Sequence, residues 1–151
     1  MTYLLDTDMI ILLVRGLKPG SRRDLRREAQ SVLERIQTRV AAGDVVGISA
    51  ITRAELEHGA AKCGNVAHER ACLEKVLTPF EAFDFTFAEA AIAYGTIRAD
   101  LELLGVPIGA MDLLIAAHAS ALKAILVSGN TAHFGRIKGL RVENWGQSGI
   151  K

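Results

Sequence analysis

The sequence predicts an α/β fold in which a parallel sheet is covered by helices on both faces. Short apolar or β-branched segments alternate along the chain with longer amphipathic ones, which is the pattern of successive strand and helix units. The chain has 151 residues, the size of about one domain, and no internal repeat or linker divides it. We therefore expect a single domain over residues 1–151.

The first part of the chain contains two predicted strands. The apolar segment Tyr3–Asp6 predicts the first, and the β-branched residues of Val45–Ser49, which follow Gly43, predict the second. Between them, Met9–Val14 indicates the start of a helix, and apolar residues at steps of three and four predict a five-turn helix over Arg22–Ala42. Thr52 and Glu55 form a capping box, so another helix is expected to begin there and run towards Gly59 or Lys62.

The second part of the chain continues the alternation. Thr86 and Glu89 form a second capping box, which predicts an Ala-rich helix ending near Leu104. Leu113–Leu122 is apolar nearly all round, which indicates a buried helix. The other expected elements are a helix over Val66–Leu77 and strands over Phe83–Phe85, Ala124–Val127 and Val142–Trp145, the last at the edge of the sheet.

Charge is unevenly distributed along the sequence although the net charge is only +1. Residues 1–53 carry 9 basic and 6 acidic side chains, residues 54–122 carry 4 and 10, and residues 123–151 carry 5 and 1. Basic surface attracts phosphate and clustered carboxylates bind divalent cations, so this division fits a protein that brings the two together. A chance division of solvated charges explains the same numbers equally well.

Acidic residues stand where ligands bind in open parallel sheets, beyond the carboxyl ends of the strands. Asp6 and Asp8 end the first predicted strand, Glu55 lies just beyond the second, and Asp112 opens the predicted buried helix. Crowded carboxylates repel one another unless they are protonated or bind a cation, and hard oxygen ligands suit Mg²⁺ or Mn²⁺. Taken singly, each acid is equally well explained as a helix cap or as a charge that complements a helix dipole.

The two cysteines and the amino terminus bear on the compartment. Cys63 and Cys72 form no C-x-x-C motif and are read as small apolar residues. No basic segment with a long apolar run opens the chain, so we expect no secretory signal and a cytoplasmic protein. The apolar run Met9–Val14 is far shorter than the roughly 20 residues of a membrane span, and none is expected.

Four segments resemble, in order and spacing, the four sequence blocks of PIN domains. They are Tyr3–Asp8, Ile48–Gly59, Ile108–Ala119 and Leu126–Phe134. The ending Ile137–Trp145 is similar to the tail of the VapC branch, the ribonuclease toxins of bacterial VapBC toxin–antitoxin modules. The resemblance covers nearly the whole chain.

This resemblance implies a flap-endonuclease-like fold, a three-layer α/β/α sandwich with a central, mostly parallel sheet. It also implies an endoribonuclease that uses Mg²⁺ or Mn²⁺ to cut RNA, often tRNA, in the cytoplasm and so inhibits translation. Toxins of this branch usually form homodimers. A VapB-type antitoxin neutralises them by covering the acidic pocket with its tail, often by inserting an arginine.

By position, Asp6, Glu55 and Asp112 match the family's catalytic and metal-binding acids, and Thr7 matches a hydroxyl residue that supports them. Asp100 stands where relatives often have a further acid; a surface charge is an equally good interpretation. The fourth block, which often carries an acid, here has Asn130 and His133. A neutral Asn130 in a supporting position favours one tightly bound cation over two. The Arg-rich segment Arg22–Ala42 looks longer than in many relatives, and the sequence assigns it no role.

Three basic residues follow the fourth block, namely Arg136, Lys138 and Arg141. Such a cluster steers an RNA backbone through salt-dependent attraction to phosphates. A solvated surface explains the cluster equally well.

Other functions fit parts of the sequence. Asp6-Thr7-Asp8 after a strand resembles the nucleophile motif of haloacid-dehalogenase-like phosphohydrolases, but no convincing match to their lysine and later acidic pair follows. A PIN-like fold without catalysis, serving as a module that binds RNA or protein, is a second alternative, which Asn130 favours and the three acids oppose. A metal-free ribonuclease would need a general base, usually histidine, and the four histidines form no evident pair.

Overall fold

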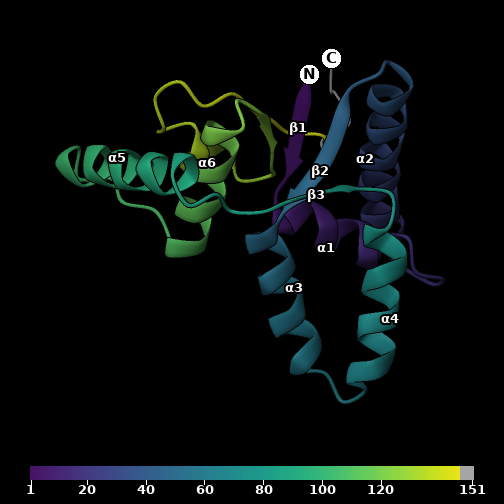
Figure 1. Ribbon diagram of the computed structural model, residues 1–151. Coiled ribbons are helices and arrows are strands. Elements are labelled where there is room, and N and C mark those ends of the chain that lie inside the picture. The colour runs from purple at the N-terminus through teal and green to yellow at the C-terminus, as the bar shows by residue number, and fades with distance from the viewer. Residues whose placement is uncertain (147–151) are drawn as a thin grey trace.

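The computed structural model describes residues 1–146 and contains a five-stranded sheet between layers of helices (Figure 1). The strand order is β3-β2-β1-β4-β5, and every pairing is parallel. The strands are β1 (Thr2–Leu5), β2 (Val45–Ser49), β3 (Glu81–Phe83), β4 (Ile125–Val127) and β5 (Val142–Glu143). β2 and β4 lie on opposite sides of β1, so the order reverses at β1, where α/β folds bind ligands beyond the carboxyl ends.

Helices cover both faces of the sheet. One face packs against α1 (Thr7–Gly16), α2 (Arg23–Ala41), α3 (Ala50–Ala61) and α4 (Val66–Leu77), and the other against α5 (Glu89–Leu103) and α6 (Ala110–Ala121). Side chains of β1 alternate between the two cores: Tyr3 and Leu5 face the first and Leu4 the second. The predicted α/β/α sandwich with a parallel sheet is thereby confirmed, and residues 147–151 of the predicted domain lie outside the described residues.

Several predicted elements match the structure closely. β2 and α4 have the predicted bounds, and α2 differs by one residue at each end. The short helix α7 (Thr131–Phe134) was not predicted, and α6 begins three residues before Leu113. None of the described helices is both long and apolar enough to cross a membrane.

The structure corrects two predicted helix starts. Ser49, and not Thr52, is the N-cap of α3, because the Ser49 hydroxyl accepts a hydrogen bond from the Ile51 amide at 3.0 Å. Thr52 is instead buried inside the first turn. The Thr86 hydroxyl accepts a hydrogen bond from the Ala90 amide at 3.1 Å, but α5 itself begins only at Glu89.

β3 begins and ends two residues before the predicted strand. Its register pairs Gly47 with Glu81, and a Cβ atom at Gly47 would lie 2.5 Å from both the Glu81 carbonyl oxygen and the Phe83 ring. The missing side chain at Gly47 therefore lets this edge strand approach β2. The sequence around Phe83 could not predict where this strand lies, because its close approach to β2 depends on Gly47, which is far away in the chain.

Candidate active site at the carboxyl edge of the sheet

Asp6 lies at the carboxyl end of β1, the central strand. It is the N-cap of α1: its Oδ1 accepts a hydrogen bond from the Thr7 amide at 2.7 Å. Its Oδ2 accepts one from the Ser128 hydroxyl, also at 2.7 Å, just beyond β4. Only 3% of Asp6 is exposed. Both carboxylate oxygens are therefore fixed by neighbouring groups.

The environment of Asp6 raises the pKa of its carboxyl group above the ordinary value in water. The pKa of Asp6 is raised from 3.8 to about 6, chiefly by burial and also by the nearby carboxylates of Asp8 and Asp112, although the hydrogen bonds from Ser128 and Thr7 act in the opposite direction. Asp112, 106 positions away in the sequence, thus contributes to the electrostatic environment of Asp6. A buried carboxyl with such neighbours is a group that a cation would stabilise in its ionised form.

Asp112 lies in the first turn of α6, with 31% of its side chain exposed. Its Oδ2 lies 3.5 Å from the Asn130 Nδ2 and 3.5 Å from the His133 Nδ1. These two groups also contact each other, with 2.8 Å between the two nitrogens. The Asn130 amide in turn donates a hydrogen bond to the Ser128 hydroxyl at 3.0 Å. A chain of polar contacts thus runs from Asp6 through Ser128 and Asn130 to Asp112.

The structure brings the predicted site residues Asp6, Asp112 and Asn130 together with His133, the other residue named in the fourth block, and adds Ser128. Ser128 was missed, although it directly follows the β4 strand, at the level where ligands bind in such sheets. That position was the available signal. Ser128 links Asp6 to Asn130, because its hydroxyl donates to Asp6 and accepts from the Asn130 amide, and Asn130 in turn contacts Asp112.

Thr7 connects the site to α3. Its hydroxyl donates a hydrogen bond to the Thr52 hydroxyl at 3.3 Å, and both side chains are buried. Glu55 follows Thr52 by one helical turn, about 5 Å along the axis, on the same side of α3. Its half-buried side chain lines a groove of about 200 Å³ together with residues of α1 and α4.

Glu55 makes no direct polar contact with the other two acids. Within residues 1–146, no hydrogen bond or ion pair links it to Asp6 or Asp112, and no three His, Cys, Asp or Glu side chains are grouped so that they could hold a metal ion. The structure therefore brings two of the predicted acids together and places the third in the adjoining groove. The assignment of Glu55 to the metal site stays a prediction.

The donor set nevertheless fits a hard divalent cation. Asp6 and Asp112 supply carboxylate oxygens, Ser128 and Asn130 supply neutral oxygens, and no cysteine lies among them. Mg²⁺ and Mn²⁺ prefer such ligands. Mg²⁺ is typically held by one or two carboxylates while it keeps several waters, so a pair of acids meets its needs.

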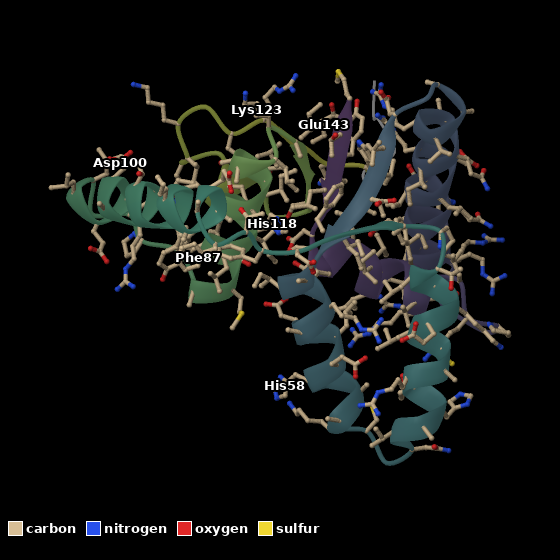
Figure 2. The ribbon with its side chains drawn as sticks, viewed as in Figure 1. His58, Phe87, Asp100, His118, Lys123 and Glu143 are labelled. Atoms are coloured by element: carbon tan, nitrogen blue, oxygen red, sulfur yellow. The ribbon has the colours of Figure 1, made fainter. Side chains whose placement is uncertain are left out.

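The predicted RNA-contacting residues lie in two places. Arg136 and Lys138 line a groove of about 320 Å³ beside α5, which Asp100 also lines. Arg141 precedes β5 near the level of Tyr3, three residues or about 10 Å along the strands from Asp6. Figure 2 shows Asp100 well out on α5. No hydrogen bond or ion pair within the described range joins Asp100 to Asp6 or Asp112, and its supporting role stays a prediction.

His118 connects α6 to the N-terminus of α3 in the interior of the protein. It is fully buried between α6 and the sheet (Figure 2), and its Nδ1 lies 2.7 Å from the Ser49 hydroxyl that caps α3. Burial lowers the pKa of His118, partly offset by Asp84, so the ring is neutral. This contact ties the helix that carries Asp112 to the first turn of the helix that carries Glu55.

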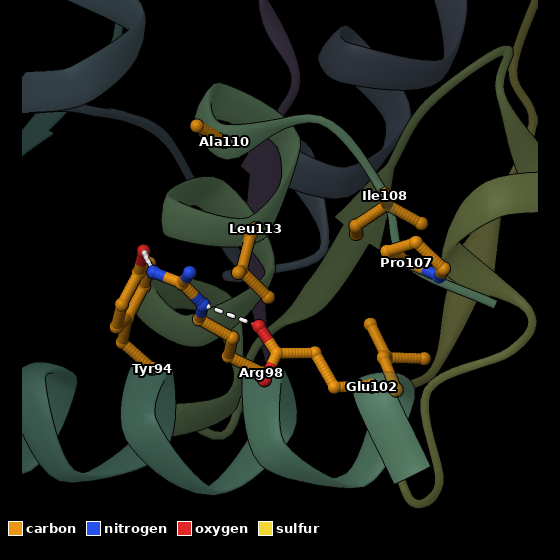
Figure 3. A pocket seen from close by; sticks show the side chains of 8 residues that line it. Tyr94, Arg98, Glu102, Pro107, Ile108, Ala110 and Leu113 are labelled. Carbon is orange, nitrogen blue, oxygen red and sulfur yellow. Dashed lines mark hydrogen bonds and ion pairs between the residues drawn. The ribbon is translucent and has the colours of Figure 1, made fainter. Parts of the chain in front are cut away.

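A separate cavity lies between α5 and α6 (Figure 3). It measures about 190 Å³, and its polar wall is formed by Tyr94, Arg98 and Glu102. Arg98 donates hydrogen bonds to the Glu102 carboxylate at 2.8 Å and to the Tyr94 hydroxyl at 3.2 Å. These side chains satisfy one another, so the cavity presents no unpaired charge to a ligand.

Comparisons with known proteins agree with this architecture. The PIN domain family model matches residues 3–140. The chain is 33% identical over 145 residues to Ribonuclease VapC2 of Rickettsia felis, covering 96% of this chain and 98% of that protein. It is 33% identical over 143 residues to the tRNA(fMet)-specific endonuclease VapC of Shigella flexneri, covering 95% and 97% of the two chains.

Solved structures show the same similarity. One is the Rickettsia felis VapBC2 bound to a DNA fragment from their promoter, which superposes with a TM-score of 0.81 at 33% identity and covers 96% of this chain and 99% of that one. Another is the DNA-bound VapBC from Salmonella typhimurium, with a TM-score of 0.80 at 32% identity and coverages of 96% and 98%.

Proposed function

Because the chain belongs to the PIN-domain family, within its VapC ribonuclease branch, we propose that it is an endoribonuclease that uses a divalent metal ion. The observation that carries this proposal is the pairing of Asp6 and Asp112 through Ser128 and Asn130 at the switch point of the sheet. We propose that residues 1–151 form one PIN domain, of which the family model matches residues 3–140. Transfer RNA is the proposed substrate, since relatives are named tRNA(fMet)-specific endonucleases.

Asp6 and Asp112 are the proposed ligands of Mg²⁺ or Mn²⁺, with Glu55 contributing directly or through water. Such an ion would polarise the scissile phosphate and lower the pKa of a bound water. The protein's own contribution is orientation: the Ser128 hydroxyl and the Thr7 amide fix the two oxygens of Asp6. Because burial raises the pKa of Asp6, its readiness to bind a cation should increase through the pH range around 6.

The remaining site residues have proposed roles in substrate binding and positioning. Asn130 and His133 flank the exposed side of Asp112, where a phosphate would approach. When the Asn130 Nδ2 donates a hydrogen bond to the His133 Nδ1, a neutral His133 ring carries its hydrogen on Nε2. The Nε2–H group can then donate a hydrogen bond to a phosphate oxygen. Arg136 and Lys138 are proposed to attract the RNA backbone from the groove beside α5, and Arg141 from the end of β5.

We further infer a VapB-type antitoxin as the neutralising partner, since similar solved structures are VapBC complexes. The groove that Glu55 lines is open between α1, α3 and α4, so a basic segment of a partner can reach this acid there. A homodimer is proposed by analogy with the family. A segment that covers Glu55 would also block substrate access to the adjoining acids.

The test is metal-dependent cleavage of purified tRNA by the purified protein. Wild type is expected to cut tRNA when Mg²⁺ or Mn²⁺ is added and to stop when EDTA is added, leaving 5′-phosphate and 3′-hydroxyl ends. Asp112→Asn should abolish cutting, whereas Asp24→Asn, an exposed acid on α2, should not. Cleavage that survives both EDTA and Asp112→Asn would refute the proposed site. A wild type that binds tRNA without cutting it would instead favour the non-catalytic binding module.

A further inference from the structure

The corner between α1 and α2 carries a concentration of positive charge. Residues 15–27 hold six basic side chains and one acidic one, a net charge of +5 in a chain whose net charge is +1. All six basic side chains are exposed. We call this surface the basic corner; its members are Arg15, Lys18, Arg22, Arg23, Arg26 and Arg27. It includes the start of the Arg-rich segment to which the sequence assigned no role.

Almost none of this charge is neutralised by other residues within positions 1–146. Among the described residues, the only ion pair of the basic corner is between Arg22 and Asp24, at 3.5 Å, with 79% and 70% of the side chains exposed. Ion pairs that are this exposed contribute little to stability. The outer face of α3 and α4 is different, because Arg53 and Arg70 there are paired with Glu57. The basic corner is therefore a source of positive potential that attracts polyanions.

The backbone that carries these cations is fixed. The Ser21 hydroxyl donates a hydrogen bond to the Gly16 carbonyl at 2.7 Å, and the Arg26 Nη2 donates one to the Lys18 carbonyl at 3.2 Å. A Cβ atom at Gly16 would lie 2.4 Å from that of Ala29, so α1 and α2 are in close contact here. The cations thus project from a defined surface and not from a loose loop.

The basic corner is continuous with the proposed active site. Arg15 and Lys18 line the same groove as Glu55. α1 begins at Thr7, next to Asp6, and reaches Arg15 eight residues later, about 12 Å along the helix axis. At about 3.4 Å per stacked nucleotide, this distance corresponds to about four nucleotides of one strand. An RNA strand with its scissile phosphate at Asp6 and Asp112 can therefore place neighbouring phosphates on the basic corner.

We propose that the basic corner is a second RNA-contacting surface, which binds the phosphate backbone several nucleotides away from the bond that is cut. The inference rests on the proposed ribonuclease function and adds a substrate track to it. Contacts of this kind are independent of sequence and depend strongly on salt. The basic corner would thus determine the affinity for RNA and its orientation, while Asp6 and Asp112 determine which phosphodiester bond of the RNA is cut.

The experiment compares two triple variants, both in the Asp112→Asn background so that bound RNA is not cut. The corner variant is Lys18→Gln, Arg22→Gln and Arg23→Gln, which spares Arg26 because it anchors the loop. The matched control removes three exposed cations from other surfaces, by Arg35→Gln, Lys75→Gln and Lys123→Gln. Binding of unfractionated tRNA is measured between 50 and 200 mM NaCl, and urea unfolding verifies that both variants are folded.

Three lost phosphate contacts should lower the steepness of log affinity against log salt by about 2.1 to 2.7, which is about 0.7 to 0.9 per contact. Over this fourfold range of salt, the parent should therefore lose about 20- to 40-fold more affinity than the corner variant. The control variant should keep the parent's slope. An equal salt slope in the corner variant and the parent would overturn the inference. This is also the result expected if the basic corner binds a protein partner and not RNA.

Cleavage measured with Asp112 intact separates the inference from the proposed function. If wild type cuts tRNA while the corner substitutions leave the salt slope unchanged, the second surface is wrong and the ribonuclease stands. If wild type binds tRNA through the basic corner without cutting it, the surface stands and the catalytic proposal fails. If wild type neither binds nor cuts tRNA, both are wrong.

Discussion

Asp6→Asn should make the metal-free protein more stable at neutral pH, although it removes a residue of the proposed active site. In the folded chain the pKa of Asp6 is about 6, against an ordinary value of 3.8. The folded state therefore holds this proton more tightly than the unfolded state does. As the pH rises from about 4 to about 6, the unfolded chain ionises first, and the free energy of unfolding falls.

The size of the effect follows from the two pKa values. Their difference corresponds to about 3 kcal/mol, which wild type loses between pH 4 and pH 7 through this one group. An asparagine cannot ionise, yet its Oδ1 can still accept the hydrogen bond from the Thr7 amide. The stability of Asp6→Asn relative to wild type should thus increase by up to about 3 kcal/mol across this range.

Urea unfolding in EDTA, at several pH values from 4 to 7.5, measures this difference directly. The control is Asp24→Asn, whose carboxylate is exposed, and its curve should run parallel to that of wild type. Addition of Mn²⁺ at pH 7.5 should restore wild type and leave Asp6→Asn unchanged, because the ion compensates the ionised carboxylate. A difference between Asp6→Asn and wild type that stays constant with pH would refute the argument that Asp6 is buried next to other acids.

Two further substitutions test other contacts of the site. Ser49→Ala should lower the free energy of unfolding by about 2 kcal/mol, because the α3 cap is lost and the His118 Nδ1 is left unpaired; a loss below about 0.5 kcal/mol in urea unfolding would contradict this. Asn130→Asp should lower the metal-free melting temperature and enlarge its rise with Mn²⁺, since a carboxylate is added beside Asp112. Equal rises in the variant and wild type would count against a cation at this position.

Much of the fold was predictable because its determinants are local. The apolar periodicity of α2, the β-branched run of β2 and the position of Asp112 at the start of α6 were all readable in the sequence. The errors arose where a distant residue decides the outcome. The sequence pattern predicts that Thr52 caps α3. In the structure, however, the Thr52 hydroxyl accepts a hydrogen bond from the Thr7 hydroxyl in the interior, and Ser49 is the N-cap.

The site shows the same division. The end of the first strand at Asp6 and the start of the buried helix at Asp112 indicated this edge of the sheet, where ligands bind in parallel α/β folds. The sequence could not show that the Ser128 hydroxyl bonds to Asp6 or that His133 turns towards Asp112, since both depend on contacts between side chains that are distant in the sequence. Nor could it show that Glu55 would line a groove together with Lys18.

The most direct test of the central claim is the position of a bound cation. Crystals of the wild-type protein soaked in Mn²⁺ should give an anomalous difference peak within about 2.0–2.6 Å of carboxylate oxygens of both Asp6 and Asp112. Asp112→Asn crystals treated in the same way should lose that peak. Crystals of protein that is active in the presence of Mn²⁺ but shows no peak between these two residues would contradict the account.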